Sequence, residues 1–453
     1  MVLSLLSTVY VAFNTPFQPG TETYFTLPLT FFLCFWLYKD IIPYHHGGFA
    51  LKVFYFFCLL RYVFLPFFTC YVGHFASRWS SNAFTYAIII QDIELIVSLV
   101  TIKHYYGRHY RKVSSKIENL RTIDYNDLGL GGLLVIGIAV LLIVIRGAGA
   151  LTSGMRFMVI NEALEEDAKY GYDRWMAQTM QAFFVIVVTG YFQKKNDKNH
   201  SFLNLIIPSI FALLSCTIVF GNNRMMVFYF AFSALSILNV SFPKYKKSIS
   251  SLMIAVVMVV IVSFTLVKQY GVNVSMGESV DVTDSGLAGT LSVYVSSTEA
   301  IAKVYDMYAV TGNQMRFSTI FADIVDKTPV FHLPGLPFLK AVQGITPSYQ
   351  LAMTGYEVVP TAGQMLYYGG YVFGWLFDIL AFWLVISLMI KLEIHSKLEL
   401  ELGNRYLYTW TSIVCSMVMC YHLGIIYNGF AYVPFFLYVA LRINKRIRLS
   451  KVS

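Results

Sequence analysis

Charged side chains are scarce in this chain, and that scarcity excludes most classes of soluble protein. Only 13% of the 453 residues are Asp, Glu, Lys or Arg, whereas 57% are hydrophobic and 17% are aromatic. In a soluble globular chain, about a quarter of the residues are charged. Disorder, a coiled coil, a disulfide scaffold and a cytosolic nucleotide-binding enzyme are therefore excluded. A lipid bilayer is the solvent that fits this composition.

Cysteine pairs and catalytic signatures are also missing. The six cysteines lie in or at the ends of apolar runs and form no CxxC pair and no zinc-ligand cluster. We expect them to be small core residues. The sequence contains no Walker A phosphate loop, no HExxH zinc motif and no GxSxG nucleophile elbow. We therefore expect no nucleotide, no metal and no other cofactor.

Long apolar runs are abundant and recur along the whole chain. They predict an all-α, polytopic membrane protein with about twelve transmembrane helices in a single integral membrane domain, residues 1–453. The first run lacks a basic leader and a small-residue cleavage site, so we expect a first span there rather than a cleaved signal. The predicted spans lie near residues 1–14, 23–38, 49–71, 82–102, 128–146, 175–192, 201–220, 225–241, 250–267, 362–390, 406–424 and 429–442.

The distribution of basic residues predicts the orientation of these spans. Residues near the end of a span are counted here with the adjoining segment. With the N-terminus placed inside, 22 of the 34 Lys and Arg residues then fall inside, 11 fall outside and one, Arg61, lies in the middle of a span. Cytoplasmic segments carry such an excess. The isoelectric point near 9.0 follows from this topology, and no motif indicates nucleic acid. Two large outside loops are predicted, at residues 147–174 and 268–361, and the second contains a helix-like segment, Ser297–Tyr308.

Arginines at the predicted outer boundary are the candidate substrate-binding residues. An arginine at a membrane boundary is costly unless it is paired or hydrated. Its planar guanidinium matches a phosphate group with two parallel hydrogen bonds, so several arginines together would hold a pyrophosphate. The alternative is that each one reaches to water or pairs with a nearby acid. The candidates are Arg146, Arg156, Arg224 and Arg316.

Acids and a histidine in the outside loops are the candidate catalytic bases. A carboxylate or imidazole within reach of a sugar hydroxyl can remove its proton. The candidates are Glu162, Glu166, Glu299 and His332, and the alternative for each is a solvated or structural role. Asp306 is open to the same two interpretations. The Tyr-, Thr- and Gln-rich segments 344–350 and 360–374, which include Tyr349, suit sugar binding, whereas their glycines favour close helix packing.

Three acids fall inside the predicted spans. Asp92 and Glu94 lie two residues apart in one span and face different sides of a helix, so they are not expected to form a paired site. Asp378 lies in the span near residues 362–390. Intramembrane acids are candidates for function. Structural pairing is favoured here over a proton or cation relay, because a relay needs more such groups on several spans.

Together these features resemble the O-antigen polymerase family, the oligosaccharide repeat-unit polymerases. The similar parts are the span count with cytoplasmic ends, the two large outside loops and their arginines. The Gly-Asn-Asn-Arg224 turn and the Gly-Tyr-Tyr-rich entry to the span near 362–390 are also similar. The family's R-x10-G pattern is not met, because Phe157, Asp167 and Lys327 stand where it requires glycine.

The resemblance implies a C-type glycosyltransferase, a polysaccharide polymerase of lipopolysaccharide biosynthesis in the bacterial inner membrane. Its active site would face the periplasm and join oligosaccharide units linked to undecaprenyl pyrophosphate. Its partners would be that lipid-linked oligosaccharide and the bilayer, with a chain-length regulator and a flippase. The near alternative is an O-antigen ligase. The alternatives from other classes are a polysaccharide flippase or secondary transporter and a structural membrane protein.

Overall fold

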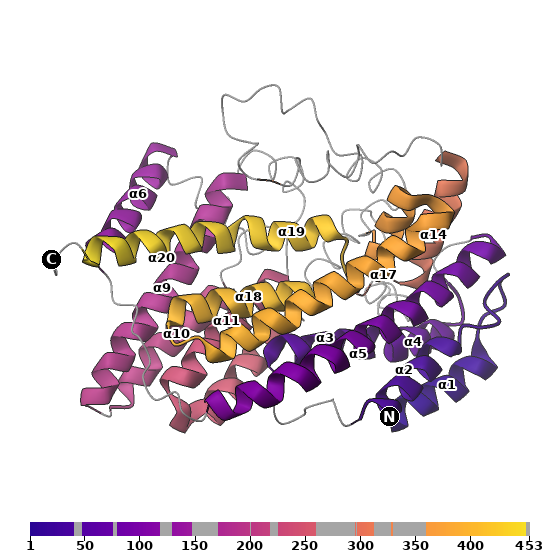
Figure 1. Ribbon diagram of the computed structural model, residues 1–453, viewed down its shortest axis with the longest axis horizontal. Coiled ribbons are helices and arrows are strands. Elements are labelled where there is room, and N and C mark those ends of the chain that lie inside the picture. The colour runs from indigo at the N-terminus through magenta and orange to yellow at the C-terminus, as the bar shows by residue number, and fades with distance from the viewer. Residues whose placement is uncertain are drawn as a thin grey trace, which may run out of the picture. The chain divides into compact units, whose positions relative to one another are not determined.

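The described part of the chain is mostly helical (Figure 1). The structure is a computed structural model that describes residues 1–39, 48–75, 79–117, 129–146, 171–199, 201–217, 225–259, 295, 297–311, 328 and 359–449. Within these ranges there is no β-strand, so the predicted all-α class is confirmed for them.

The helices follow the apolar runs of the sequence closely. Residues 246–259 are also helical. In chain order the named elements are α1 (Val2–Asn14), α2 (Thr26–Leu37), α3 (Phe49–Leu59), the π-helix η1 (Leu60–Phe64), α4 (Leu65–Val72), α5 (Ser81–Ile117), α6 (Leu130–Arg146), α9 (Gly171–Lys198), α10 (Leu203–Thr217), α11 (Met225–Ser241), the 3-10 turn η2 (Pro243–Tyr245), α14 (Thr298–Thr311), α17 (Thr361–Leu398), α18 (Leu402–Ser416), α19 (Leu423–Ala431) and α20 (Val433–Leu449).

Five of the described helices are long and apolar enough to cross a membrane. A sixth span is present if the bent pair Met226–Ser241 and Pro243–Val259, which meet at 119°, counts as one. The five are Phe49–Val72, Ser81–Tyr105, Trp175–Lys198, Thr361–Leu398 and Leu423–Lys445. Many of their large apolar side chains point outward, as lipid contact requires. The chain is therefore a polytopic membrane protein, and the count of twelve spans stays a prediction.

The chain divides into two compact units, which are described separately. Unit 1 contains Met1–Ser114, Val282–Lys391 and Val414–Ala431. Unit 2 contains Ser115–Asp281, Leu392–Ile413 and Tyr432–Ser453.

A π-helical turn interrupts the first long span of unit 1. The helix widens over η1, directly before Pro66 in α4. Proline has no backbone N–H and its ring collides with the carbonyl four residues earlier, so the preceding turn must open. The Ser7 hydroxyl of α1 donates to the Val63 carbonyl at 2.9 Å and so satisfies one group of this turn. The turn also contains Arg61, the basic residue that the sequence places within a span.

Helix α14 belongs to the second large predicted outside loop, yet it packs along α5. The predicted helix at Ser297–Tyr308 is confirmed. Asp306 accepts hydrogen bonds from the Ser80 backbone N–H and hydroxyl and so caps the start of α5. At the other end of α14, Thr298 hydrogen-bonds Gln91 at 2.8 Å. Gln91 lies ten residues after Ser81, about 15 Å along α5. The two helices are therefore antiparallel, and α14 begins deep beside the span.

Helix α17 is broken near its start by a glycine. Gly370 has φ +65° and ψ −171°, a backbone conformation that favours glycine. A Cβ on Gly374 would lie 2.6 Å from the Leu366 Cα, and a Cβ on Gly369 would lie 2.7 Å from the Gly374 N. Residues eight apart in a continuous helix are about 12 Å apart. Residues 361–369 therefore fold back on the rest of α17 as a hairpin, and the predicted packing role of these glycines is confirmed.

Unit 2 is built from α6, α9, α10, α11 and α20, together with the first part of α18. Helix α9 packs on α10, α11 and α20, and α20 also packs on α6. Asn444 of α20 accepts hydrogen bonds from the backbone N–H groups of Gly129 and Gly132 at 2.8 and 3.0 Å, which satisfies the start of α6. Trp410 of α18 is buried against Phe230 of α11, with ring centres 4.9 Å apart.

Candidate functional site: a buried charged cluster in unit 1

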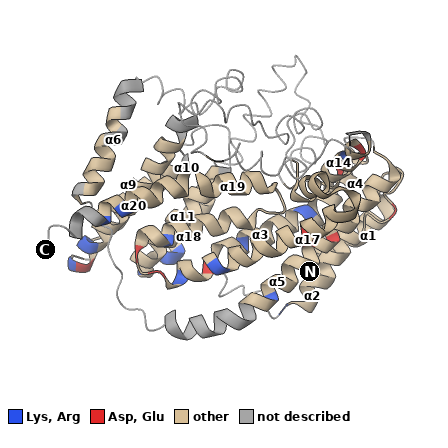
Figure 2. Cartoon of the chain, turned by 45° about the horizontal axis from the view of Figure 1, so that its top comes forward, with Lys and Arg blue, Asp and Glu red and all other residues tan. Residues whose placement is uncertain are grey.

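An arginine and a glutamate are paired in the interior of unit 1. The Arg61 guanidinium, in η1, donates to the Glu94 carboxylate of α5 at 2.7 Å, and each side chain is only 1% exposed. In Figure 2 most described helices are free of charged residues over most of their length. A buried ion pair rarely stabilises a fold more than apolar side chains of the same volume. A charged pair within membrane spans therefore marks a candidate site.

A buried amide extends this pair to α14. With the Gln91 side-chain amide oriented to suit its neighbours, its oxygen accepts from Arg61 Nε and Nη2 at 3.2 and 3.1 Å, and its nitrogen faces the Thr298 hydroxyl at 2.8 Å. The Tyr62 hydroxyl donates to the Gln91 backbone carbonyl at 2.6 Å. The guanidinium is thus held between a carboxylate and an amide, and the network joins η1, α5 and α14.

A second acid, Asp378 of α17, lies within electrostatic reach of the pair. Glu94 and Arg61 are its main charged neighbours. Its side chain is 1% exposed, and neither carboxylate oxygen has a hydrogen-bond partner within the described residues. One oxygen of Glu94, Oε1, is also without a partner there. Three ionisable side chains from three elements therefore lie together in the interior of unit 1. Their carboxylate oxygens outnumber the hydrogen bonds that described residues donate to them.

Tyrosines form a chain of rings from α5 through α14 to α17. Tyr86 contacts Tyr305 with ring centres 4.9 Å apart, and Tyr305 contacts Tyr371 at 4.7 Å. Tyr308 meets Tyr371 edge-on at 4.8 Å. The Tyr371 hydroxyl donates to the Tyr305 carbonyl at 3.2 Å, and 41% of the Tyr371 side chain is exposed. This row gives the cluster an aromatic surface at the Gly370 end of the hairpin.

Three helices begin close to the cluster. Helix α14 begins at Thr298, beside Gln91, and α17 begins at Thr361. The Thr361 hydroxyl donates to the carbonyls of Val418 and Tyr421 at 3.1 and 2.6 Å, in the turn after α18. Gln364 accepts from the Leu423 N–H at 2.8 Å, which caps the start of α19. Broken helices of this kind are how membrane proteins place polar backbone groups in their interior.

Of the predicted catalytic residues, only Glu299 lies within the described residues. It stands in the first turn of α14, next to Thr298, and only 8% of it is exposed. An acid near a helix N-terminus is favourable, because unpaired N–H groups give that end a partial positive charge. Tyr24, in the turn before α2, is among the groups that the Glu299 charge reaches. Glu299 is thus built into the fold, unlike a solvated surface acid.

The other predicted site residues are not brought together by the described structure. Arg146 is the last residue of α6, in unit 2, and its side chain lies outside the description. Asp306, open to either role, caps α5. The predicted residues that lie outside the described ranges are Arg156, Glu162, Glu166, Arg224, Arg316, His332 and Tyr349.

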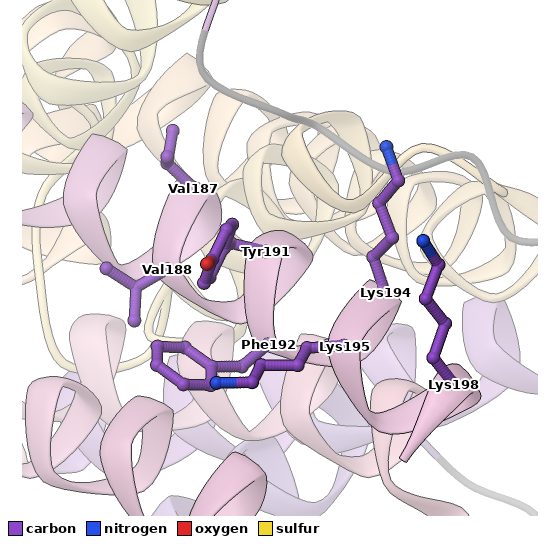
Figure 3. A pocket seen from close by; sticks show the side chains of 7 residues that line it. All are labelled: Val187, Val188, Tyr191, Phe192, Lys194, Lys195 and Lys198. Carbon is purple, nitrogen blue, oxygen red and sulfur yellow. The ribbon is translucent and has the colours of Figure 1, made fainter.

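A hollow in unit 2 is a weaker candidate. It runs beside the second half of α9 and is lined by Val187, Val188, Tyr191, Phe192, Lys194, Lys195 and Lys198 (Figure 3). All seven side chains come from one helix, and the lysines gather in its last turns, where they complement the negative end of the helix. The hollow brings no second element's chemistry to a ligand, so we assign it no site.

Sequence reasoning anticipated part of this cluster. The expectation that Asp92 and Glu94 are not paired with each other fits the structure, since Glu94 pairs with Arg61. The partner itself was missed, although a single base in a span alongside interior acids was a usable signal. The hairpin at Gly370 and the role of Gln91 were also missed.

No protein-family model, curated protein or solved structure gives a match to this chain. The functional conclusion therefore depends on the residues and their geometry.

Proposed function

We propose that this chain is a polymerase of lipid-linked oligosaccharide repeat units. It would work in a bacterial inner membrane with about twelve spans and cytoplasmic ends, its active site facing the periplasm. The growing glycan would leave undecaprenyl pyrophosphate and pass to the non-reducing end of a new lipid-linked unit. The bond to the old pyrophosphate breaks and a bond to an acceptor hydroxyl forms, so the donor itself supplies the driving force.

The position of α14 supports this proposal best. This helix comes from the second large predicted outside loop, yet it packs against α5 and places Glu299 in a buried first turn. A carboxylate held at a helix start has the chemistry of a base that acts on a sugar hydroxyl, and the same helix carries Tyr305 and Tyr308 of the tyrosine row. Aromatic faces pack against the C–H groups of sugar rings, and the part-exposed Tyr371 offers one such face.

The predicted outer arginines are the proposed pyrophosphate-binding residues. As the glycan leaves, negative charge develops on the pyrophosphate, and guanidinium groups that are already oriented would stabilise it. Arg156, Arg224 and Arg316 are assigned this role from the sequence pattern, with Arg146 at the end of α6. The proposed chemistry needs no nucleotide, because the leaving pyrophosphate is part of the donor.

The arginines supply the test. In cells that make the polymer, Arg156→Ala, Arg224→Ala and Arg316→Ala should each shorten or abolish the ladder of polymer lengths while membrane expression is unchanged. A lost bidentate contact costs roughly 2–4 kcal/mol in the transition state, or about thirty- to a thousand-fold in rate. Lysine at the same positions should restore the polymer ladder only partly, since an ammonium cannot donate the two parallel hydrogen bonds of a planar guanidinium. Full ladders from all three alanine variants at normal expression would remove the arginine site.

A second candidate, a flippase or ion-coupled transporter, is favoured by the interrupted helices that meet at buried acids. The same experiment separates the two candidates. Polymerase variants should still deliver single repeat units to the cell surface, because flipping and ligation belong to other proteins. Loss of those single units as well would favour transport. If the protein is instead an O-antigen ligase, the arginine variants should still form polymer on its lipid carrier, but none of that polymer should be attached to the lipid A core.

A further inference from the structure

The positive and negative charges of the interior cluster do not balance. Arg61 contributes one positive charge, and Glu94 and Asp378 contribute one negative charge each when they are ionised. Both acids are 1% exposed, and among the described residues three of their four carboxylate oxygens accept no hydrogen bond. An uncompensated charge in a protein interior is strongly unfavourable. Neutrality requires one more positive charge inside this cluster.

The groups around Asp378 explain which acid is left over. Glu94 has a direct partner, the Arg61 guanidinium at 2.7 Å. That guanidinium is further engaged by the Gln91 amide. Asp378 has neither contact, although both charges act on it.

The titratable groups facing the cluster come from each element packed around it. They are Cys58, Arg61 and Tyr62 of the first long span, Tyr86 and Glu94 of α5, and Cys420 of the turn after α18. On α14, Thr298 hydrogen-bonds Gln91, and the titratable Glu299 is the next residue. Besides Arg61, none of these supplies a positive charge.

We infer that Asp378 is a proton-binding site inside unit 1 and that it carries its proton in the folded protein. In this state the carboxylate has become a neutral carboxylic acid, and Arg61 and Glu94 cancel each other. A proton is the smallest ligand that restores neutrality, and it needs only one oxygen. A metal cation needs about six oxygen ligands, and the described residues hold no group of three His, Cys, Asp or Glu that could bind one.

The site is placed to affect the hairpin of α17. Asp378 lies eight residues after the break at Gly370, on the helix that residues 361–369 pack against. Loss of the proton would leave an unpaired carboxylate beside Glu94, and water would have to enter to solvate it. Proton release would therefore loosen the packing of the hairpin against α5 and α14. This inference goes beyond the polymerase proposal and does not depend on it.

Infrared spectroscopy of the purified full chain tests the assignment without any activity. The protein is labelled with an isotope at the aspartate side-chain carboxyl carbon, so that only aspartates respond. Wild-type protein at neutral pH should show the carbonyl band of a protonated, non-ionised aspartic acid that exchanges slowly in heavy water. Asp378→Asn should lose this band, and Asp92→Asn, a matched change in the neighbouring span, should keep it. A wild-type spectrum without the band, or a band that survives Asp378→Asn, would overturn the proposal.

Thermal unfolding gives a second measurement that does not need the variant to be active. If the folded chain holds a proton that the unfolded chain releases, wild-type stability must fall as pH rises across the neutral range. Asp378→Asn, which mimics the neutral acid, should flatten that slope by one proton. If Asp378→Asn does not fold, Asp378→Glu takes its place, because it keeps a carboxyl group at the site but removes it from the aspartate label, so it too should lose the band. Stabilisation by sodium chloride over choline chloride, present in wild type but absent in Asp378→Asn, would show a metal cation in place of the proton.

Discussion

The two units place their charged side chains in opposite ways. In unit 1, Arg61, Glu94 and Asp378 are buried in the middle of long helices. In unit 2, the described charged groups lie near helix ends, as in the pair of Lys445 and Glu401, whose side chains are 51% and 16% exposed. The buried acid among the described residues of this unit, Glu393, lies near the end of α17 and pairs with the partly exposed Lys397 at 3.8 Å. Polar contacts deep in unit 2 use neutral groups, such as the Ser241 hydroxyl that donates to Gln193 at 2.8 Å.

The most buried of the described arginines in unit 2 also lies near a helix end. Arg405 stands in the first turn of α18 and donates to the Glu399 carbonyl at 3.3 Å. Burial lowers the pKa of its guanidinium to about 10, and the nearby Glu399 charge opposes that decrease. The group therefore stays charged at neutral pH.

This difference shows that packing alone does not require the charges of unit 1. Unit 2 builds a core of Trp410, Phe230 and neutral polar groups from helices of similar composition. Because buried charges reduce stability relative to apolar replacements, the buried charges of unit 1 indicate a functional role. The α14 helix with Glu299 and the tyrosine row belong to the same unit. Unit 1 is therefore where we expect the base and the aromatic surface for the sugar. Three of the proposed pyrophosphate-binding arginines, Arg146, Arg156 and Arg224, belong to unit 2.

Glu299→Gln is expected to have the largest effect on activity. It keeps the shape of a buried side chain while removing the proposed base, so polymer formation should fall about 100- to 10,000-fold, with folding retained. The measurement is the polymer ladder together with membrane expression. Glu401→Gln in unit 2 is the matched control and should leave the ladder unchanged. A normal ladder from Glu299→Gln would leave α14 with a structural role only.

Arg61→Met is expected to have the largest effect on stability. It leaves the Glu94 carboxylate buried without its counter-charge, which should cost about 3–5 kcal/mol. The apparent unfolding temperature of the purified protein and its recovery from detergent report the loss. Adding Glu94→Gln to this variant should restore much of it.

The pair in unit 2 provides the control for this prediction. Lys445→Met breaks an ion pair whose lysine is 51% exposed, so it should cost less than about 1 kcal/mol. Equal losses from Arg61→Met and Lys445→Met would remove the contrast between the units.

Gly374→Ala should have a smaller effect, through packing alone. The new Cβ would lie 2.6 Å from the Leu366 Cα, so the hairpin must open. Overpacking of this kind costs about 1–3 kcal/mol. Gly137→Ala in α6 is the control, because a Cβ there meets nothing within 4 Å. An unfolding temperature for Gly374→Ala that matches Gly137→Ala would contradict the hairpin.

The sequence predicted the helices better than the site. Apolar runs and turn residues place the long helices 49–72 and 81–105 to within three residues at each end, because membrane spans leave a strong local signal. The start of the helix 175–198 is also predicted, but its end lies six residues beyond the predicted one. The helix at 298–311 was also predicted. Its burial along α5 was not, because the hydrogen bond between Thr298 and Gln91 joins residues 207 positions apart.

The charged cluster illustrates the same limit. The sequence identifies Glu94 and Asp378 as interior acids, but not that Arg61 neutralises only the first. That distinction depends on how η1 opens before Pro66 and how α17 turns at Gly370, both results of three-dimensional packing. The outer arginines remain predictions from pattern and resemblance.

Polymerisation by the purified full chain tests the central claim most directly. Wild-type protein in lipid vesicles is given lipid-linked repeat units, excess EDTA and no nucleotide, and the products are separated by length. The account predicts chains of several units from wild type and few or none from Arg224→Ala and Glu299→Gln. Single units that wild type never extends, with or without added magnesium or manganese, would contradict it. Extension that depends wholly on those metals would rule out an arginine-only site.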